Sequence, residues 1–222
     1  MKLLDEIVLW PDERLTDTCE EISEITDEIR DIAKRMLQDM YATDGVGLAA
    51  PQIGVLKRMV VIDVDYPDGQ KNPFVLINPE VITADGEPRT YNEGCLSFPG
   101  ITVPVTRPSH VVVHAQNLDG DLMQYEAEGD LFAVCLQHEI DHINGITMPD
   151  HLGPTARMEA LQHYQEALAA GANIWTAFFG TEGVFQVLDR IISFLICWAV
   201  IKVIPTRNLI KFSLGELYIK KK

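Results

Sequence analysis

One segment near the middle of the chain restricts its fold more than any other: residues 134–145, Val-Cys-Leu-Gln-His-Glu-Ile-Asp-His-Ile-Asn-Gly. It contains a His-Glu-x-x-His pattern, in which His138 and His142 are four positions apart. On a helix such residues lie on one face, one turn above each other, and two imidazoles placed in this way can bind a single metal ion. Glu139 follows the first histidine and can reach a water molecule on that metal without being a ligand itself.

The segment has the pattern of a helix. Four apolar side chains recur at helical spacing: Ala133, Leu136, Ile140 and Ile143. Asn144-Gly145 is a natural helix end. The alternative is a chance pair of surface histidines. Because the flanking residues are apolar, however, the histidines and the carboxylate are expected to be buried, and buried polar groups need partners. The segment therefore predicts a metal site.

A third ligand is expected from a cysteine. Cys95 stands in the sequence Glu-Gly-Cys-Leu-Ser of residues 93–97, and a thiolate suits a metal that is already held by two histidines. The alternative is a buried, inert cysteine, which is the common fate of a single Cys. Cys135 is a rival ligand on the same helical face, three residues before His138, although its apolar neighbours favour a place in the wall of the site. The residues alone favour Cys95 and leave both open.

Composition separates the chain into two parts. Its 222 residues are 47% hydrophobic and carry a net charge of −15, which argues against a surface that binds nucleic acid. Residues 173–222 hold seven Lys or Arg and three Asp or Glu, a net charge of +4, so residues 1–172 carry −19. We therefore predict an acidic catalytic domain over residues 1–172 and an apolar, basic extension over residues 173–222.

The cysteines and the N-terminus predict a cytoplasmic protein. The four cysteines, at positions 19, 95, 135 and 197, are widely spaced, form no Cys-x-x-Cys pair and suggest no disulfide framework. Asp5 and Glu6 stand where a signal peptide would need an apolar run.

The residues before the central segment predict a helix and then a close-packed loop. Residues 25–41 have the apolar periodicity of an amphipathic helix. Residues 45–54 are rich in glycine and alanine, which lets another part of the chain approach the backbone closely. Their spacing fits neither of the glycine-rich phosphate motifs, so we reject a phosphate loop. Gln52 is either an ordinary loop residue or an amide that donates a hydrogen bond to an oxyanion.

Several strands are expected around the central helix. They cover residues 59–64, residues 74–79 with an end at the proline, a third strand at 81–83, a long β stretch over 103–115 that Pro108 interrupts, and residues 122–125 after an Asn-Leu-Asp-Gly hairpin turn. A further helix is expected from Pro154 to about Ala169. Several strands followed by one central helix predict an α+β fold rather than alternating β-α units.

Three short motifs together resemble the peptide deformylase family. They are Gly-Val-Gly-Leu-Ala-Ala-Pro-Gln at residues 45–52, Glu-Gly-Cys-Leu-Ser at 93–97 and Gln-His-Glu-Ile-Asp-His at 137–142. The resemblance covers about residues 1–152. It implies a mixed or antiparallel β-sheet wrapped around a central helix that carries the His-Glu-x-x-His pattern. It also implies a metal-dependent hydrolase that removes the N-formyl group from N-formylmethionine of newly made polypeptides and releases formate.

The resemblance also implies a role for each matching residue. Cys95, His138 and His142 would bind one divalent metal ion, with Fe²⁺ expected first and Zn²⁺ or Ni²⁺ as alternatives. Glu139 would act as general base and then as general acid. The oxyanion hole would be formed by Gln52 and the backbone N–H of Leu96. The implied substrate-binding residues are Val46, Gly47, Arg107 near the exit of the peptide, and Val134 and Cys135 in the methionine pocket. Asp141 would hold a histidine or a neighbouring loop, unless it is simply a solvated helix acid.

Residues 173–222 depart from the family pattern. Residues 191–201 are apolar on all sides, but this run of eleven is shorter than the roughly 20 residues of a spanning helix. Three interpretations stay open: a helix that lies in a membrane surface, a segment that contacts another protein, or a tail with no selected role. The expected partners of the whole chain are N-formylmethionyl nascent peptides, with the ribosome as a further candidate and no direct nucleic-acid site.

Two other functions compete. The first is a metallopeptidase, which would need a third ligand downstream, such as Glu159 or Glu166. The second is a deformylase-like domain that binds without catalysis, for which the loss of a ligand or of Glu139 would have been the signal.

Overall fold

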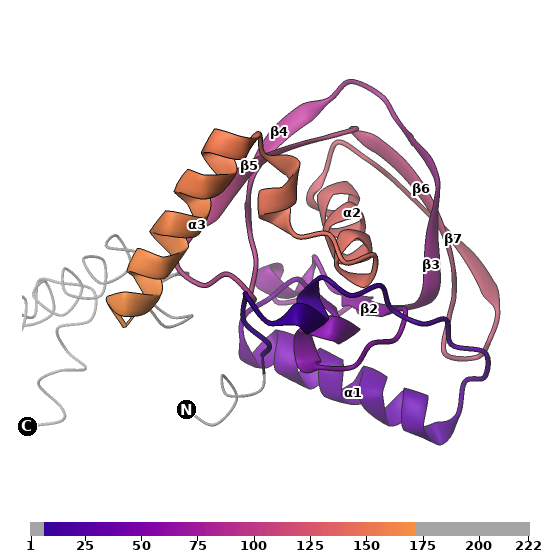
Figure 1. Ribbon diagram of the computed structural model, residues 1–222. Helices are drawn as coiled ribbons and strands as arrows, with labels where there is room; N and C mark the ends of the chain where they lie inside the picture. The colour runs from indigo at the N-terminus through magenta and orange to yellow at the C-terminus, as the bar shows by residue number, and fades with distance from the viewer. Residues whose placement is uncertain (1–6, 172–222) are drawn as a thin grey trace, which may run out of the picture. The chain divides into compact units, whose positions relative to one another are not determined.

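The computed structural model describes residues 7–171 and shows an α+β fold (Figure 1). Its helices are α1 (Asp27–Ala42), α2 (Leu131–Ile143) and α3 (Pro154–Ala169). Its strands are β1 (Gly47–Ala49), β2 (Met59–Ile62), β3 (Phe74–Asp85), β4 (Arg89–Gly94), β5 (Thr102–Arg107), β6 (His110–Gln116) and β7 (Leu122–Glu128). Short 3-10 turns include η2 (Glu13–Leu15), η3 (Ala50–Ile53), η4 (Tyr66–Asp68) and η5 (Met148–His151). The predicted extension, residues 173–222, lies outside the described residues. None of the helices within 7–171 is long and apolar enough to cross a membrane.

The strands form two antiparallel sheets. One has five strands in the order β1-β2-β3-β6-β7, and the other is the pair β4-β5. Every pairing between these named strands is antiparallel; the parallel pairing found within residues 7–171 is an isolated bridge between Glu20 and Lys57. The expectation of an α+β protein with antiparallel sheets is therefore confirmed.

Strand β2 is buried on both faces and separates two parts of the core. Met59 and Val61 pack in the cluster that contains the apolar face of α1, whereas Val60 and Ile62 pack in the cluster that contains α2. All four side chains are fully buried. A strand covered on both sides needs a continuous apolar run, and this explains the sequence Met-Val-Val-Ile.

The sequence analysis predicted separate strands at residues 74–79 and 81–83, but the structure has one continuous strand there, β3. It continues through Pro79 to Asp85, because the pairing with β6 shifts register between Ile77 and Glu80. Asn78 has a φ of 49° at this irregularity. A bulge leaves residues outside the regular hydrogen-bond ladder, so that a proline, which has no N–H, is tolerated there.

The β stretch predicted over residues 103–115 divides at Pro108 between the two sheets. The part before it is β5, which pairs with β4, and the part after it is β6, which pairs with β3 and β7. Strand β4, which the sequence analysis did not predict, has the polar sequence Arg-Thr-Tyr-Asn-Glu-Gly.

Helix α2 lies inside the bend of β3, β6 and β7 in Figure 1 and carries His138, Glu139 and His142. Its N-terminus is capped by Asp130, whose Oδ1 accepts a hydrogen bond of 2.9 Å from the N–H of Ala133. Ten of its thirteen residues are buried. The helix therefore holds its polar side chains within the core.

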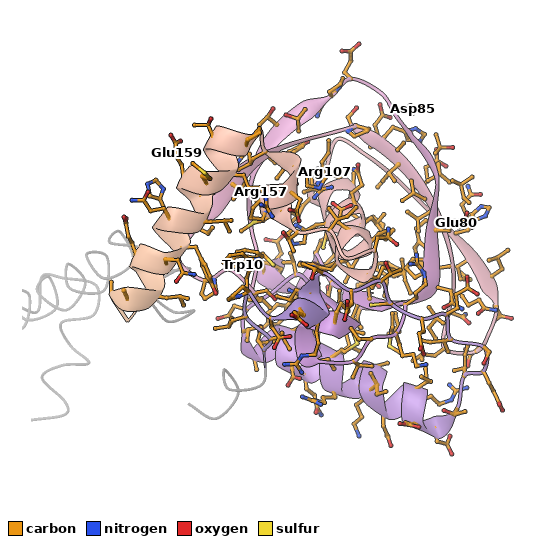
Figure 2. The ribbon with its side chains drawn as sticks, viewed as in Figure 1. Trp10, Glu80, Asp85, Arg107, Arg157 and Glu159 are labelled. Atoms are coloured by element: carbon orange, nitrogen blue, oxygen red, sulfur yellow. The ribbon has the colours of Figure 1, made fainter. Side chains whose placement is uncertain are left out.

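Helix α3 joins a third apolar cluster through Tyr164. The Tyr164 hydroxyl donates a hydrogen bond of 2.8 Å to the carbonyl oxygen of Trp10, and both rings pack against Phe98. The N–H of Trp10 in turn donates to the carbonyl of Ser97 at 3.1 Å. Figure 2 labels Trp10 between α3 and the rest of the described residues. Helix α3 is thus tied to the segment that follows Cys95.

Candidate metal centre

Three potential metal ligands converge where strand β4 ends against helix α2. The ligand atoms of Cys95, His138 and His142 all lie within 4.8 Å of one another. Cys95 follows the last residue of β4, and its Sγ is 3.1 Å from Nε2 of His142. The two histidines are one helical turn apart on α2, and their ring centroids are 5.0 Å apart. Two segments distant in sequence thus bring one sulfur and two imidazoles to a single point.

The electrostatics of this cluster favour a thiolate. Burial by itself would raise the pKa of Cys95, but the charge of His142 and hydrogen bonds from both histidines lower it to about 5. Burial opposes a charge on His138, yet its hydrogen bonds with Cys95 and Glu93 raise its pKa well above the usual range. A lowered pKa of Cys95 favours the thiolate, which is the form of a cysteine that binds a metal ion.

The donor set fits a divalent transition metal. One thiolate and two imidazoles are soft and borderline ligands of the kind that Zn²⁺ and other late first-row ions bind, and three protein ligands leave a coordination position open. Two buried polar atoms beside the cluster, Nδ1 of His142 and Oε2 of Glu139, have no hydrogen-bond partner within the described part of the chain. These two atoms can therefore form hydrogen bonds with a bound ligand or water molecule.

The rival ligand, Cys135, is outside this group. Burial and the charge of Glu139 raise its pKa well above the usual range, which disfavours the thiolate that a metal would need. Its Sγ is instead 3.6 Å from the carbonyl oxygen of Val46. Cys135 is therefore a neutral wall residue.

Glu139 is a buried carboxyl that can exchange a proton near neutral pH. It is 5% exposed, and burial raises its pKa to about 7 against the opposing charges of His138 and His142. A group of this kind serves well in general acid–base catalysis, because it is available in both protonation states. A bound cation would lower this pKa by its positive charge.

Gly47 leaves room for the Glu139 carboxylate. A Cβ atom at Gly47 would overlap with Oε1 of Glu139 and would lie 2.6 Å from Sγ of Cys135. The glycine at this position of β1 is thus required by the close approach of α2, and not by an unusual backbone conformation. This is the close approach that the glycine-rich segment predicted.

Two potential hydrogen-bond donors lie beside the cluster. Gln52 is 2% exposed and its Oε1 accepts from the N–H of Ala49 at 2.8 Å, which fixes the amide. Its Nε2 is then directed toward Oγ of Ser97 at 3.2 Å and Sγ of Cys95 at 3.5 Å. Leu96 follows Cys95, and its backbone N–H has no hydrogen-bond partner among residues 7–171. The N–H of Leu96 is available to a ligand, whereas the Gln52 amide is held within hydrogen-bond distance of Ser97 and Cys95.

The sequence analysis gave no role to Glu93, although it stands in a quoted motif. Its carboxylate accepts hydrogen bonds from Nδ1 of His138 at 2.8 Å, and from Nε and Nη2 of Arg107 at 2.6 and 2.9 Å. Burial opposes its charge, but these bonds lower its pKa. A carboxylate on Nδ1 fixes the tautomer of an imidazole and directs Nε2 toward a metal.

The resemblance implied that Arg107 lies near the exit of the peptide, and the structure shows its side chain buried. It is 4% exposed, and its guanidinium is held between Glu93 and Asp141, with Nη1 2.8 Å from Oδ2 of Asp141. Figure 2 labels Arg107 beside α2. The reason is the alternation of β5, where Val103, Val105 and Arg107 all point into the core. Arg107 therefore supports the carboxylate that orients His138.

The remaining residues expected to contact a substrate lie near Glu139. Val46 and Cys135 are in contact, and Val134 precedes Cys135 on α2 and is 8% exposed. Asp141 is bonded to Arg107 and also to Nε2 of His151 at 2.7 Å. It is therefore not a freely solvated helix acid, and the sequence analysis did not single out His151.

The chain is similar to known proteins over most of its described length. The model of the polypeptide deformylase family matches residues 4–158. A peptide deformylase from Hydrogenovibrio crunogenus is 43% identical over 168 residues, which is 76% of this chain and 97% of that protein. One from Rhodopseudomonas palustris is 40% identical over 170 residues, with the same coverage.

Solved structures show the same likeness. A peptide deformylase from Legionella pneumophila superposes with a TM-score of 0.69 at 38% identity, over 74% of this chain and 95% of that one. One from Synechococcus elongatus, solved in complex with actinonin, has a TM-score of 0.67 at 39% identity, over 70% of this chain and 85% of that one.

Proposed function

The chain belongs to the polypeptide deformylase family, whose members are metal-dependent hydrolases that remove the N-formyl group from nascent polypeptides, and we propose that Cys95, His138 and His142 hold its metal. The observation that supports this most is the convergence of their ligand atoms within 4.8 Å, next to the buried carboxyl of Glu139. When bound, the divalent ion supplies Lewis-acid polarisation and lowers the pKa of a water molecule.

Glu139 moves the proton in this proposal. Its carboxylate takes a proton from the attacking water and returns it to the amine that leaves, so that formate and a free N-terminus are produced. Burial raises the pKa of Glu139 and favours its protonated form, whereas the charge of a bound cation would favour the ionised form that accepts the first proton. The unpartnered Oε2 of Glu139 is the atom available for the transfer.

Gln52 and Leu96 stabilise the oxygen that gains charge. The amide Nε2 of Gln52 is already directed toward Cys95, and the N–H of Leu96 follows the same cysteine. Fixed donors of this kind act on developing charge without reorganisation, and removing one typically costs on the order of 10²–10³ in rate. A Gln52→Ala variant is therefore expected to lose kcat rather than affinity for the substrate.

Substrate contacts are assigned to the wall beside Glu139. Gly47 offers its backbone to the peptide, Val46 lies next to it, and Val134 and Cys135 line the pocket for the methionine side chain. The closeness of Cys135 to both Val46 and the Cβ position of Gly47 supports this assignment. Arg107 is not included, because its donors are taken up by Glu93 and Asp141.

The identity of the metal and the cellular location of the activity are further proposals. Fe²⁺ is our first choice and Zn²⁺ or Ni²⁺ are alternatives, because all three suit a set of one thiolate and two imidazoles. We place the activity in the cytoplasm, where nascent formylated chains are made, with the ribosome as a candidate partner. A contact of residues 173–222 with a membrane surface or another protein is a separate hypothesis.

The competing metallopeptidase has little support. Its third ligand would be Glu159 or Glu166, but both lie exposed on α3, and the metal-binding group found within residues 7–171 contains neither. Figure 2 labels Glu159 on α3. A purely binding domain is disfavoured by the presence of all three ligands and of Glu139.

The decisive experiment measures formate release from formyl-Met-Ala-Ser by anaerobically purified protein, with the metal content determined on the same sample. A matched Glu139→Gln variant should bind the same amount of metal. Its kcat should fall by at least the roughly 10²–10⁴-fold that acid–base catalysis contributes. A metal-loaded wild type that cleaves unformylated peptides and releases no formate would favour the metallopeptidase. Substantial turnover by Glu139→Gln would remove Glu139 from its role.

A further inference from the structure

A chain of hydrogen bonds leads from the protein surface to the metal-ligand cluster. It begins at His151 in η5, whose Nε2 is 2.7 Å from Oδ2 of Asp141 on α2. The same oxygen accepts a hydrogen bond of 2.8 Å from Nη1 of Arg107 on β5. Arg107 then reaches Glu93 through Nε and Nη2, and Glu93 accepts from Nδ1 of His138 at 2.8 Å. Four side-chain contacts thus join His151 to a proposed ligand.

The middle of this chain is stiff. Arg107 and Glu93 are both almost fully buried, with side-chain exposures of 4% and 3%. A guanidinium is a planar fork with fixed donor directions, so that a shift of the Asp141 carboxylate at Nη1 changes the alignment of Nε and Nη2 on Glu93. Glu93 in turn fixes the ring of His138. Displacement at one end is therefore transmitted to the other.

The Asp141 carboxylate is placed by His151 as well as by Arg107. A single oxygen, Oδ2, accepts from both partners. Without His151, Arg107 would be the sole side-chain donor to this carboxylate among those described, and Asp141 could turn toward solvent.

We propose that His151 is a positioning residue for the metal centre, which it reaches through Asp141, Arg107 and Glu93. This inference rests on the proposed function only in that it takes His138 as a metal ligand. His151 touches neither substrate nor metal in this proposal. It fixes the Asp141 carboxylate, so that Arg107 and Glu93 keep His138 in the orientation in which it retains the ion.

A purely local role for His151 can be separated from this one. Its neighbour Asp150 holds η5 in place, since Oδ2 accepts from the N–H and hydroxyl of Thr147 at 2.8 and 2.6 Å. Oδ1 of Asp150 pairs with Arg157 on α3. Figure 2 labels Arg157 as well as Arg107. An Arg157→Gln variant therefore loosens the same turn without touching the chain of contacts to His138.

The test compares the full-length wild type with His151→Leu, His151→Gln and Arg157→Gln, each loaded with Zn²⁺. The rate of metal release to a chromophoric chelator is measured, together with kcat and KM on formyl-Met-Ala-Ser. The side chain of His151 is 28% exposed, so these variants should fold. His151→Leu should release Zn²⁺ about three- to tenfold faster, below the roughly 10–100-fold effect of losing a direct partner of a ligand. Its kcat should fall with KM unchanged.

The conservative variant and the control decide the interpretation. His151→Gln keeps an N–H donor at the end of the side chain and should restore slow release, whereas Arg157→Gln should behave as the wild type. Release from His151→Leu at the wild-type rate would overturn the proposal, as would faster release from Arg157→Gln or a failure of glutamine to restore it. If the wild type retains Zn²⁺ but releases no formate, the proposed function fails while the release rates still decide the role of His151.

Discussion

At the scale of single residues, the site depends on how closely β1 approaches α2. Gly47 has no Cβ, and this lets the Glu139 carboxylate and the Cys135 sulfur occupy the space beside its backbone. Neither group can move away freely, because α2 is packed among buried side chains of the five-stranded sheet. One missing methyl group thus fixes where the proposed general base can lie.

A Gly47→Ala substitution should therefore impair catalysis much more than folding. The new methyl group would displace Glu139, and small displacements of a catalytic group can cost about 10²-fold in rate. We expect kcat/KM for formyl-Met-Ala-Ser to fall by at least that factor, with metal content unchanged. Gly153→Ala is the matched control, since its Cβ would meet nothing within 4 Å. Equal activity of the two variants would show that Glu139 tolerates the methyl group.

How far the site could be predicted differs from residue to residue. The proposed ligands and Glu139 stand in short motifs whose residue types and spacing predict a metal site. The structure brings Cys95, His138 and His142 together. Arg107 was given a place near the peptide exit by the resemblance, whereas the structure shows it buried between Glu93 and Asp141. The alternation of Val103, Val105 and Arg107 was the signal that could have placed it inside. The contact of His151 with Asp141 depends on tertiary packing, which no spacing in the sequence reports.

At the scale of elements, the helices were predicted more accurately than the strands. The helix expected over residues 25–41 is α1, from Asp27 to Ala42, and the one expected from Pro154 is α3. Strand β4 was missed because its residues are mainly polar and, within residues 7–171, it pairs with β5 alone. The boundary at Pro79 was wrong because a bulge absorbs the proline. The hydrogen bonds of a helix are local, so its sequence pattern predicts it well. The hydrogen bonds of a strand are made with another strand, which the local pattern does not identify.

The start of α2 offers a test of element stability that leaves the site intact. Removing the cap with Asp130→Ala leaves the N–H of Ala133 without its acceptor, and such a loss costs about 0.5–2 kcal/mol. Asp130→Asn should preserve stability, because asparagine caps about as well as aspartate. Urea unfolding of both variants measures the difference. A loss with asparagine as large as with alanine would mean that the charge, and not the cap, is what stabilises the helix.

At the scale of the whole molecule, stability should depend on pH through buried groups outside the metal cluster. Burial raises the pKa of Cys19 from 9.0 to about 11. A thiol that keeps its proton longer in the folded state contributes stability that is complete below pH 9 and is lost as pH rises toward 11.

The difference between the wild type and Cys19→Ala isolates this contribution, since other groups cancel. The stability advantage of the wild type over the variant should be constant from pH 6 to 8 and smaller by about 1 kcal/mol at pH 10. Unfolding in urea at each pH measures it. A difference that stays constant up to pH 10 would show that Cys19 ionises as easily in the folded chain as in the unfolded one.

Truncation should separate the described part of the chain from the rest. All residues assigned to the site lie between Val46 and His151, so a chain that ends at Gly171 should keep its deformylase activity. A chain that ends at Gly153 loses α3, including the buried Tyr164 and its bond to Trp10. It should melt at a lower temperature. Loss of activity from a well-folded chain ending at Gly171 would show that residues 172–222 contribute to the activity.

The position of the proposed ligands has a consequence for how long the protein survives proteolysis. Cys95 comes from the end of the β4-β5 sheet, whereas His138 and His142 come from the helix packed on the other sheet. An ion bound to all three is a removable cross-link that closes a long loop of the chain, and a ligand that binds only the folded state stabilises it by mass action. Metal starvation would then expose the polypeptide to proteolysis, so that scarcity of the ion lowers the amount of the enzyme as well as its activity.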